Sequence, residues 1–310
     1  MMEIGIETHS LTKKFENITA VNNIDIKVKH NTIYGLVGPD GAGKTTTMRM
    51  LTSLLKPDGG TAKIAGMDIV EKSDEIKKHI GYMPQKFSLY GDLTVMENLE
   101  FYSEIYQIPK KVSRKKIEYL LEFSNLTEHS YKLSDQLSGG MKQKLALSCN
   151  LIHTPKYLFL DEPTIGVDPV ARRELWKILF DLRNQGVTIF VSTPYMDEAE
   201  RCDEIGLMDK GRIIINDKPE NIINKFEKYI FCVYSDNNHL AKDIALNVKG
   251  VEDAYLLGEE LHIVAERLDI EKQLKNKFTK SNINVKISLI QPNLEDIFVN
   301  IVKNQHKGDD

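Results

Sequence analysis

The chain has 310 residues, of which 41% are hydrophobic and 28% charged, so it is long enough for two domains with separate cores. Its formal net charge of −4 gives no basic footprint of the kind that nucleic-acid binding needs. The 3 cysteines and 8 histidines stand at no paired or metal-ligand spacing, which predicts reduced thiols and ordinary surface or core histidines. No apolar stretch approaches a membrane-spanning length, and the first residues lack a basic and apolar signal, so we expect membrane contact only through a partner.

A phosphate-binding loop follows the first clear strand. Residues 32–37 are apolar enough for a buried strand, and residues 46–51 can begin a helix. The sequence between them fits G-x-x-x-x-G-K-[ST], in which glycines let backbone N–H groups approach phosphates, Lys44 supplies a positive charge and Thr45 can ligate Mg²⁺. The residues expected to contact a nucleotide here are Gly38, Pro39, Asp40, Gly41, Ala42, Gly43, Lys44, Thr45 and Thr46.

A helical subdomain is predicted at about residues 88–142. Gln85 lies just ahead of it, at the end of a short strand. One helix is expected to start in residues 93–101, where Thr94 can act as the cap with Glu97 three residues further on. A second helix is expected at residues 113–123.

A second glycine-containing loop and a pair of carboxylates follow the helical subdomain. Residues 137–140, Leu-Ser-Gly-Gly, open a helix that we expect to continue to about Asn150. The apolar strand at residues 157–160 then ends in Asp161 and Glu162. In a phosphate-loop ATPase the first carboxylate at such a strand end faces Mg²⁺, and the second can polarise an attacking water. Because one nucleotide does not need two phosphate loops from one subunit, the second loop calls for a separate explanation.

The pattern of strands and helices changes near residue 228. Residues 1–85 and 145–218 alternate strands and helices, as in an α/β phosphate-loop NTPase core. The later order is β-α-β-β-α-β, which predicts a small ferredoxin-like α+β domain. We therefore expect a nucleotide-binding domain at residues 1–222 and an accessory or regulatory domain at residues 228–305.

The order of these motifs resembles that of the nucleotide-binding subunits of ATP-binding cassette (ABC) transporters, over about the first 220 residues. The resemblance is carried by the phosphate loop, Gln85, the Leu-Ser-Gly-Gly loop, the Asp161-Glu162 pair and the turn at residues 166–169. Residues 292–298 resemble the C-terminal tail of bacterial subunits in the drug and lipid exporter (ABC-2) branch. The resemblance implies an ATPase with the ABC type of phosphate-loop fold that uses ATP and Mg²⁺.

The resemblance implies roles for the matched positions. Glu162 and Gln85 are the implied catalytic residues, and Thr45, Gln85 and Asp161 are the implied contacts of Mg²⁺. Phe15 stands where the family places an aromatic ring against adenine, although a core phenylalanine is the alternative. In a head-to-tail dimer, the second loop of one subunit would close over ATP held by the other subunit, which explains its presence. The residues implied at that interface are Ser138, Gly139, Gly140 and Asp168.

Two positions depart from the family pattern. Pro194 stands where the family usually has a histidine that contacts the terminal phosphate, and proline offers neither a side-chain donor nor a backbone N–H. The site is then either slower but active through Glu162, which we favour, or paired with a different ATPase subunit that supplies a complete site. Asp40 replaces the more usual asparagine, and we expect its carboxylate to point away from the phosphates, which would repel it.

The resemblance also implies partners. It implies one or more membrane permease subunits, a homodimer or a heterodimer with another ABC ATPase, and a peripheral position on the cytoplasmic face of the cell membrane. Phe87 and Tyr90, beside Gln85, resemble the surface that receives the permease. The implied function is energising an exporter of drugs, lipids or similar compounds. The permease would recognise the cargo, so this sequence does not name it.

A soluble ABC ATPase that acts on ribosomes or nucleic acid is the alternative function. Such proteins usually carry two cassettes in one chain or a long coiled insert, together with a basic surface. This sequence has one cassette and an acidic balance, so we expect no nucleic-acid partner. A gene for a membrane subunit next to this one would decide between the two functions.

Overall fold

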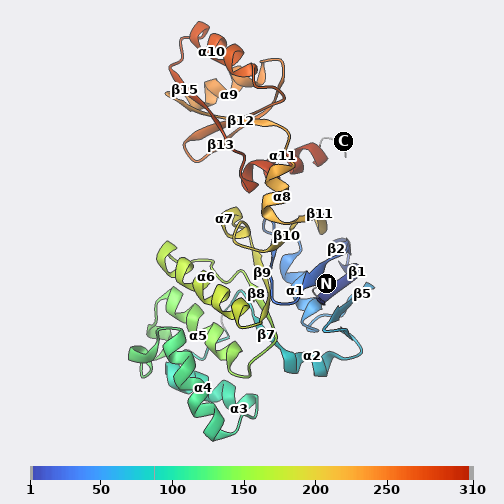
Figure 1. The fold of residues 1–310 in the computed structure, drawn as a ribbon, viewed down its shortest axis with the longest axis vertical. Helices are drawn as coiled ribbons and strands as arrows, with labels where there is room; N and C mark the ends of the chain where they lie inside the picture. The colour runs from blue at the N-terminus through green and yellow to red at the C-terminus, as the bar shows by residue number, and fades with distance from the viewer. Residues whose placement is uncertain (1–2, 87, 307–310) are drawn as a thin grey trace. The chain divides into compact units, whose positions relative to one another are not determined.

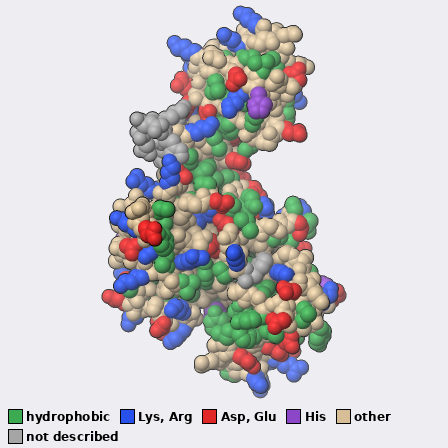
Figure 2. Space-filling view, turned by 180° about the vertical axis from the view of Figure 1, so that it is seen from behind, with side chains coloured by type: hydrophobic (Ala, Val, Ile, Leu, Met, Phe, Trp, Pro, Cys, Tyr) green, Lys and Arg blue, Asp and Glu red, His purple; other side chains and the backbone are tan. Residues whose placement is uncertain are grey.

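The computed structural model describes residues 3–86 and 88–306, with side chains described as far as Lys303. The chain divides into two compact units, Met1–Asp217 and Lys218–Asp310 (Figure 1). Within the described ranges, none of the helices is both long and apolar enough to cross a membrane. On the face shown in Figure 2, Lys and Arg side chains are interspersed with Asp and Glu, and hydrophobic side chains gather toward the lower end.

A largely parallel sheet with the strand order β11-β10-β4-β9-β8-β7 forms the centre of the first unit. Strands β10, β4, β9, β8 and β7 run parallel to their neighbours, and β11 pairs antiparallel with β10. β4, β8 and β9 are buried along their whole length, as expected of apolar strands covered on both faces. The predicted α/β core is confirmed. The bounds are β4 Ile33–Val37, β7 Ile80–Met83, β8 Tyr157–Asp161, β9 Thr188–Thr193, β10 Glu204–Asp209 and β11 Arg212–Asp217.

Strands that lie before and after the phosphate loop in the sequence form a second, antiparallel sheet, which was not predicted. Its strand order is β2-β1-β5-β6, and β3 also pairs with β1. Register shifts interrupt the pairing of β1 with β2, β3 and β5, so its buried residues do not alternate strictly. That irregularity hides the period of two on which strand prediction depends. The bounds are β1 Ile4–Phe15, β2 Ile18–Ile24, β3 Lys27–Lys29, β5 Gly59–Ile64 and β6 Met67–Asp68.

Three helices of the first unit, α3, α4 and α5, pack together (green in Figure 1), and α5 continues past residue 142, the expected end of the helical subdomain. Thr94 and Glu97 form the predicted capping box at the start of α3. α4 starts at Lys110, earlier than the expected Ser113, directly after Pro109, whose fixed φ suits a helix entrance. The bounds are α1 Lys44–Leu51, α2 Ser73–His79, α3 Val95–Ile105, α4 Lys110–Phe123, α5 Gly139–Leu151, α6 Pro169–Asn184 and α7 Met196–Ala199.

The second unit contains the predicted β-α-β-β-α-β order, with antiparallel strands in the order β13-β14-β12-β15. This is the ferredoxin-like arrangement. One face of the sheet packs on α9 and α10 through a cluster that includes Phe231, Leu261 and Phe278. The bounds are α8 Pro219–Asn224, β12 Tyr229–Ser235, α9 Asn238–Leu246, β13 Val251–Leu257, β14 Glu260–Ala265, α10 Ile270–Lys280, β15 Val285–Ile290 and α11 Leu294–His306.

His262 of the second unit has neighbours that the linear sequence did not indicate. His262 lies beside Cys232 and two carboxylates, those of Glu260 and Asp296, although no linear spacing in the sequence marks such a group. The physical reason is the strand register, which places Cys232 directly opposite His262 on β12 and β14. Residues far apart in the sequence become neighbours through this pairing.

Candidate functional site

The phosphate loop connects β4 to α1 and requires glycine at two points. Gly43 has φ 107°, and a Cβ there would lie 2.3 Å from the carbonyl oxygen of Ala20. A Cβ on Gly38 would lie 2.1 Å from the carbonyl oxygen of Met208. The loop therefore closes tightly against its surroundings and leaves its amides at the N-terminus of α1, where an anion is favoured.

Lys44 is the first residue of α1 and is almost fully buried, with 4% of its surface exposed. Its Nζ donates hydrogen bonds to the carbonyl oxygens of Gly38 at 2.8 Å and Pro39 at 2.9 Å. The same Nζ lies 3.0 Å from Oε1 of Glu162. The loop thus holds the ammonium group at its own centre, beside the carboxylate expected to act on water.

Asp161 ends β8 and faces the start of α1. Its Oδ1 accepts hydrogen bonds from Thr45 Oγ1 at 3.1 Å and from Ser192 Oγ at 2.7 Å. Its Oδ2 is buried and has no hydrogen-bond partner among the described residues. A buried carboxylate oxygen without a donor is costly unless a cation or another donor satisfies it. A hydroxyl and a free carboxylate oxygen are hard ligands that suit Mg²⁺, so the residues present fit this ion.

Glu162 follows Asp161 and is held from three sides. Its Oε2 accepts a hydrogen bond from Gln85 Nε2 at 2.8 Å, and its backbone N–H donates to Ser192 Oγ at 3.0 Å. Its φ of 51° lies in the left-handed region, which is strained for a residue with a side chain. This turn of the backbone and the three contacts fix the carboxylate beside Lys44.

Ser192, at the end of β9, is a site residue that the sequence analysis missed. It is the register partner of Asp161 across β8 and β9, and its hydroxyl bridges Asp161 and Glu162. Strand pairing is the signal that could have found it, because the pairing of β9 with β8 brings the Ser192 hydroxyl beside the two carboxylate residues.

A cavity of about 310 Å³ opens over the phosphate loop. Asp40 is exposed and lies in its lining, so this residue is close to where the phosphates are expected. Phe15 lies outside this lining, at the end of β1, with 46% of its surface exposed and Lys13 Nζ 5.5 Å from its ring centroid. The lining residues are Ala20, Asp40, Gly41, Gly43, Lys44, Thr45, Thr46, Gln85 and Glu162.

The Leu-Ser-Gly-Gly loop does not line the cavity of its own chain. Ser138 caps α5, accepting a hydrogen bond from Met141 N at 3.3 Å. Gly140 touches α6: a Cβ on it would lie 2.5 Å from the Cβ of Ala171. Two helix N-termini, those of α5 and α6, are therefore packed closely together.

Asp168 caps α6 and is also absent from the cavity lining. Its Oδ1 accepts from Val170 N at 2.9 Å and Ala171 N at 3.0 Å. These backbone hydrogen bonds, led by that of Ala171, hold the pKa of the carboxyl below its usual value. Asp168 is therefore ionised at neutral pH, exposed, and fixed in orientation at the start of α6.

Pro194 follows β9 and begins a segment held by a buried ionic group. The fully buried Glu198 accepts a hydrogen bond from Thr193 Oγ1 at 2.7 Å and lies 3.5 Å from Arg172 Nε of α6. The Arg172 guanidinium also lies 4.3 Å from the centroid of the Tyr195 ring. The segment around Pro194 is thus tied to α6, the helix that Asp168 caps.

The aromatic surface expected beside Gln85 is described in part. Phe87 lies outside the described residues. Tyr90 has 45% of its surface exposed and packs edge-on against Phe101 of α3, with 4.6 Å between ring centroids.

Comparison with known proteins identifies the family. A sequence model of the ABC transporter family matches residues 21–165, a stretch that includes the phosphate loop and the Asp161-Glu162 pair. The chain is 30% identical over 304 residues to the daunorubicin resistance ATP-binding protein DrrA2 of Streptomyces coeruleorubidus, covering 96% of this chain and 94% of that protein. The chain belongs to the ABC transporter family.

Other members of the ABC family match over different lengths. The probable multidrug ABC transporter ATP-binding protein YbhF of Escherichia coli is 38% identical over 306 residues, which cover 97% of this chain and 53% of YbhF. The chain thus spans about half the length of this curated relative. A solved dimeric ATP-binding cassette in a post-hydrolysis state, bound to ADP and Pi, superposes with a TM-score of 0.63 at 26% identity, covering 69% of this chain and 98% of the cassette.

Proposed function

We propose that this ABC protein hydrolyses ATP with Mg²⁺ and uses the reaction to energise a separate membrane permease. The observation that carries the proposal is the buried group of Lys44, Asp161 and Glu162 beside the cavity over the phosphate loop. Phosphoryl transfer to water requires a cation for the phosphates, a ligand for Mg²⁺ and a base for the water. Lys44 is the cation, Asp161 has a carboxylate oxygen without a partner among the described residues, and the Glu162 carboxylate is held toward the cavity.

Different residues of the chain have different roles in hydrolysis. The amides at the start of α1 and the Lys44 ammonium bind the outer phosphates, and the ammonium exchanges its carbonyl contacts for phosphate oxygens. Thr45 and Asp161 would hold Mg²⁺, which would neutralise negative charge on the phosphate oxygens. Glu162 accepts the proton of the attacking water, while Gln85, bonded to Glu162 Oε2, orients both. Ser192 fixes the two carboxylates relative to each other.

The second loop acts in a dimer. Ser138, Gly139 and Gly140 lie outside the cavity of their own chain, and their N-terminal helix amides suit the phosphates held by a second subunit. Asp168, fixed at the adjacent helix start, would face across the same interface. The dimer is a homodimer or pairs this chain with another ABC ATPase. ATP bound between two subunits then stabilises the closed dimer, and hydrolysis releases it.

Size-exclusion chromatography with light scattering tests the dimer. Glu162→Gln keeps the binding groups but removes the proton acceptor, so this variant is expected to elute as a dimer with ATP and Mg²⁺ and as a monomer without ATP. Glu118→Gln, on the exposed surface of α4, is the matched control and should not accumulate the dimer. A Glu162→Gln variant that stays monomeric at ATP concentrations saturating its site contradicts an ATP-bound homodimer.

The proposed cargo is a drug, a lipid or a similar compound, exported by the permease, with this chain on the cytoplasmic face of the membrane. Support comes from the relatives, whose names include multidrug and daunorubicin resistance ATP-binding proteins. Exposed Tyr90 and the hydrophobic side chains that gather toward one end of the face in Figure 2 suit a protein partner.

Affinity purification of the tagged chain from detergent-solubilised membranes tests the permease. A multi-span membrane protein should co-purify, and its yield should fall when Tyr90 is changed to aspartate. Recovery of ribosomal proteins or RNA in place of a membrane protein would contradict this function and support the soluble alternative.

A further inference from the structure

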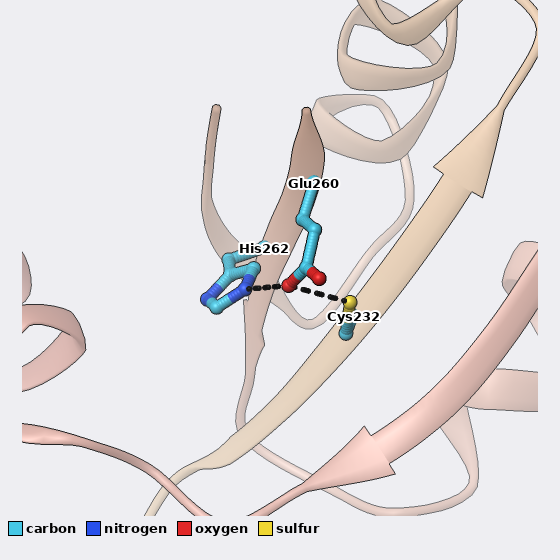
Figure 3. A group of neighbouring side chains, drawn as sticks. All are labelled: Cys232, Glu260 and His262. Atoms are coloured by element: carbon cyan, nitrogen blue, oxygen red, sulfur yellow. Dashed lines mark hydrogen bonds and ion pairs between the residues drawn. The ribbon is translucent and has the colours of Figure 1, made fainter. Parts of the chain in front are cut away.

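Three side chains with metal-binding atoms meet on one face of the sheet in the second unit. Cys232 of β12 lies directly opposite His262 of β14 in the antiparallel register, and Glu260 precedes His262 by two residues, on the same face. Figure 3 shows the three side chains pointing toward one another from these two strands. The opposite face of the sheet packs on α9 and α10, so this group belongs to the other face.

The distances between the three side chains suit a single ion. His262 Nε2 lies 3.3 Å from Glu260 Oε2, and Cys232 Sγ lies 3.3 Å from the same oxygen. One ligand atom from each residue falls within 4.8 Å of the others. Zinc bonds of about 2.0–2.3 Å at tetrahedral angles place ligand atoms about 3.4–3.6 Å apart. The group therefore needs only small side-chain movements to bind zinc.

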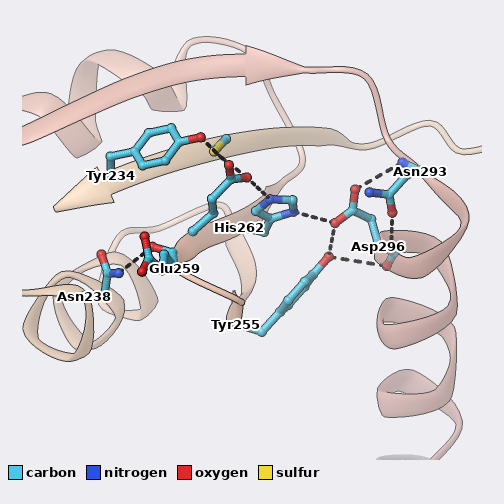
Figure 4. Close-up of polar contacts among 9 residues, drawn as sticks. Tyr234, Asn238, Tyr255, Glu259, His262, Asn293 and Asp296 are labelled. Atoms are coloured by element: carbon cyan, nitrogen blue, oxygen red, sulfur yellow. Dashed lines mark hydrogen bonds and ion pairs between the residues drawn. The ribbon is translucent and has the colours of Figure 1, made fainter. Parts of the chain in front are cut away.

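His262 is oriented for this role by a carboxylate behind it. Its Nδ1 lies 2.6 Å from Oδ1 of the fully buried Asp296, which also accepts from Tyr255 OH at 2.8 Å (Figure 4). Asn293 N donates to Oδ2 of Asp296 at 3.1 Å and holds the carboxylate in place. An Nδ1–H bonded to a carboxylate turns Nε2 toward Glu260 and Cys232. Metal-binding histidines in proteins commonly have this support.

The group is accessible from one side. Cys232 and His262 are 3% and 2% exposed, whereas the Glu260 side chain is 38% exposed. The Cys232 thiol donates a hydrogen bond to Glu260 Oε2. The Tyr234 hydroxyl also contacts Glu260. An ion can enter past Glu260 and take the place of the thiol proton and of any proton on His262 Nε2, and these protons pass to solvent.

We propose that Cys232, Glu260 and His262 bind one Zn²⁺ or similar borderline-soft ion, with a fourth position open to water. A thiolate and an imidazole favour zinc over Mg²⁺, which prefers the oxygen ligands at Thr45 and Asp161. Asp296 acts as a positioning residue through His262. Because Asp296 lies on α11 and the ligands lie on β12 and β14, the ion strengthens the contact between this helix and the sheet.

Metal titration of the full chain in excess Mg²⁺ tests the proposal, because Mg²⁺ occupies the oxygen-only sites. Calorimetry with Zn²⁺ should give one ion per chain, and Co²⁺ should produce a thiolate-to-metal charge-transfer band. Zn²⁺ should also raise the unfolding temperature of the second unit. Cys232→Ala should lose the band and bind Zn²⁺ at least about tenfold more weakly, whereas Cys149→Ala, a matched control at another buried thiol, should keep both.

Two further variants separate zinc binding from folding. Glu260→Gln, at the partly exposed ligand, should weaken Zn²⁺ binding while leaving the unfolding temperature of the metal-free chain unchanged within about 2 °C. Asp296→Asn should keep the Co²⁺ band but weaken Zn²⁺ binding about 10- to 100-fold. Absence of Zn²⁺ binding up to millimolar concentration, or a Co²⁺ band that survives in Cys232→Ala, would overturn the proposal.

Discussion

The two polar sites of this chain are built in different ways. At the phosphate loop, side chains come from the start of α1 and from the ends of the parallel strands β8 and β9, and Asp161 Oδ2 has no partner among the described residues. In the second unit, Asp296 accepts from His262, Tyr255 and the Asn293 backbone, and Glu260 accepts from Cys232. The first site leaves a buried carboxylate oxygen for a ligand to satisfy, whereas the carboxylates of the second site have donors within the chain. Removing the Lys44 side chain should therefore lower ligand affinity at the first site, whereas changing Asp296 should lower the stability of the second unit.

The largest expected effect is on ATP binding. Lys44→Ala removes a buried positive charge and its hydrogen bonds to the outer phosphates, so ATP affinity should fall about a thousandfold, or about 4 kcal/mol. Calorimetry with ATP and Mg²⁺ measures it. If affinity changes by less than about twofold, the phosphate loop does not depend on Lys44, and the contrast between the two sites fails.

The second prediction concerns the internal satisfaction of the other site. Asp296→Asn removes the charge from a buried carboxylate that holds His262, which should lower the free energy of unfolding by about 3 kcal/mol. ATP affinity should stay the same. Glu271→Gln, which breaks an ion pair on the surface of α10, is the control and should cost less than about 1 kcal/mol. Equal effects of the two variants in urea unfolding would contradict the role of Asp296.

A smaller effect is expected where the two helix starts meet. Gly140→Ala places a Cβ 2.5 Å from that of Ala171, so α5 and α6 must separate, at a cost of about 1–3 kcal/mol. Gly139→Ala meets its nearest atom, the Gly166 carbonyl oxygen, at 3.5 Å and should be neutral or stabilising. Thermal unfolding of the two variants distinguishes them. Similar unfolding temperatures of the two variants would show that the close contact of α5 with α6 does not contribute to stability.

The smallest effect concerns the missing phosphate contact. Pro194→His should raise ATP turnover by up to about tenfold, because one donor to the terminal phosphate returns. Pro194→Ala, which loosens the backbone without adding a donor, is the control. Turnover should be measured for the chain alone and with its permease. An equal rise in both variants would assign the effect to the backbone, and no rise in either setting would mean that Glu162 suffices or that a partner subunit compensates.

The phosphate loop, the two carboxylates and Gln85 could be predicted because each lies in a short contiguous pattern. Ser192 could not, because it joins the site only as the register partner of Asp161 across β8 and β9. The group at His262 was missed for the same reason, since its members meet through the pairing of β12 with β14. In the fold, the bulged strand β1 concealed the antiparallel sheet, whereas the regular strands of the core and the Thr94 cap were predicted. In both units, therefore, the residues that could not be predicted were those that meet only across paired strands.

The most direct test of the account compares ATP hydrolysis with ATP binding in the same samples. Phosphate release should be measured with Mg²⁺ for the parent chain, for Glu162→Gln and for the surface control Glu118→Gln. We predict that Glu162→Gln loses about a hundredfold or more in turnover while its ATP affinity stays within about twofold, and that the control matches the parent. Hydrolysis by Glu162→Gln at the parental rate would contradict the central claim that Glu162 activates the attacking water.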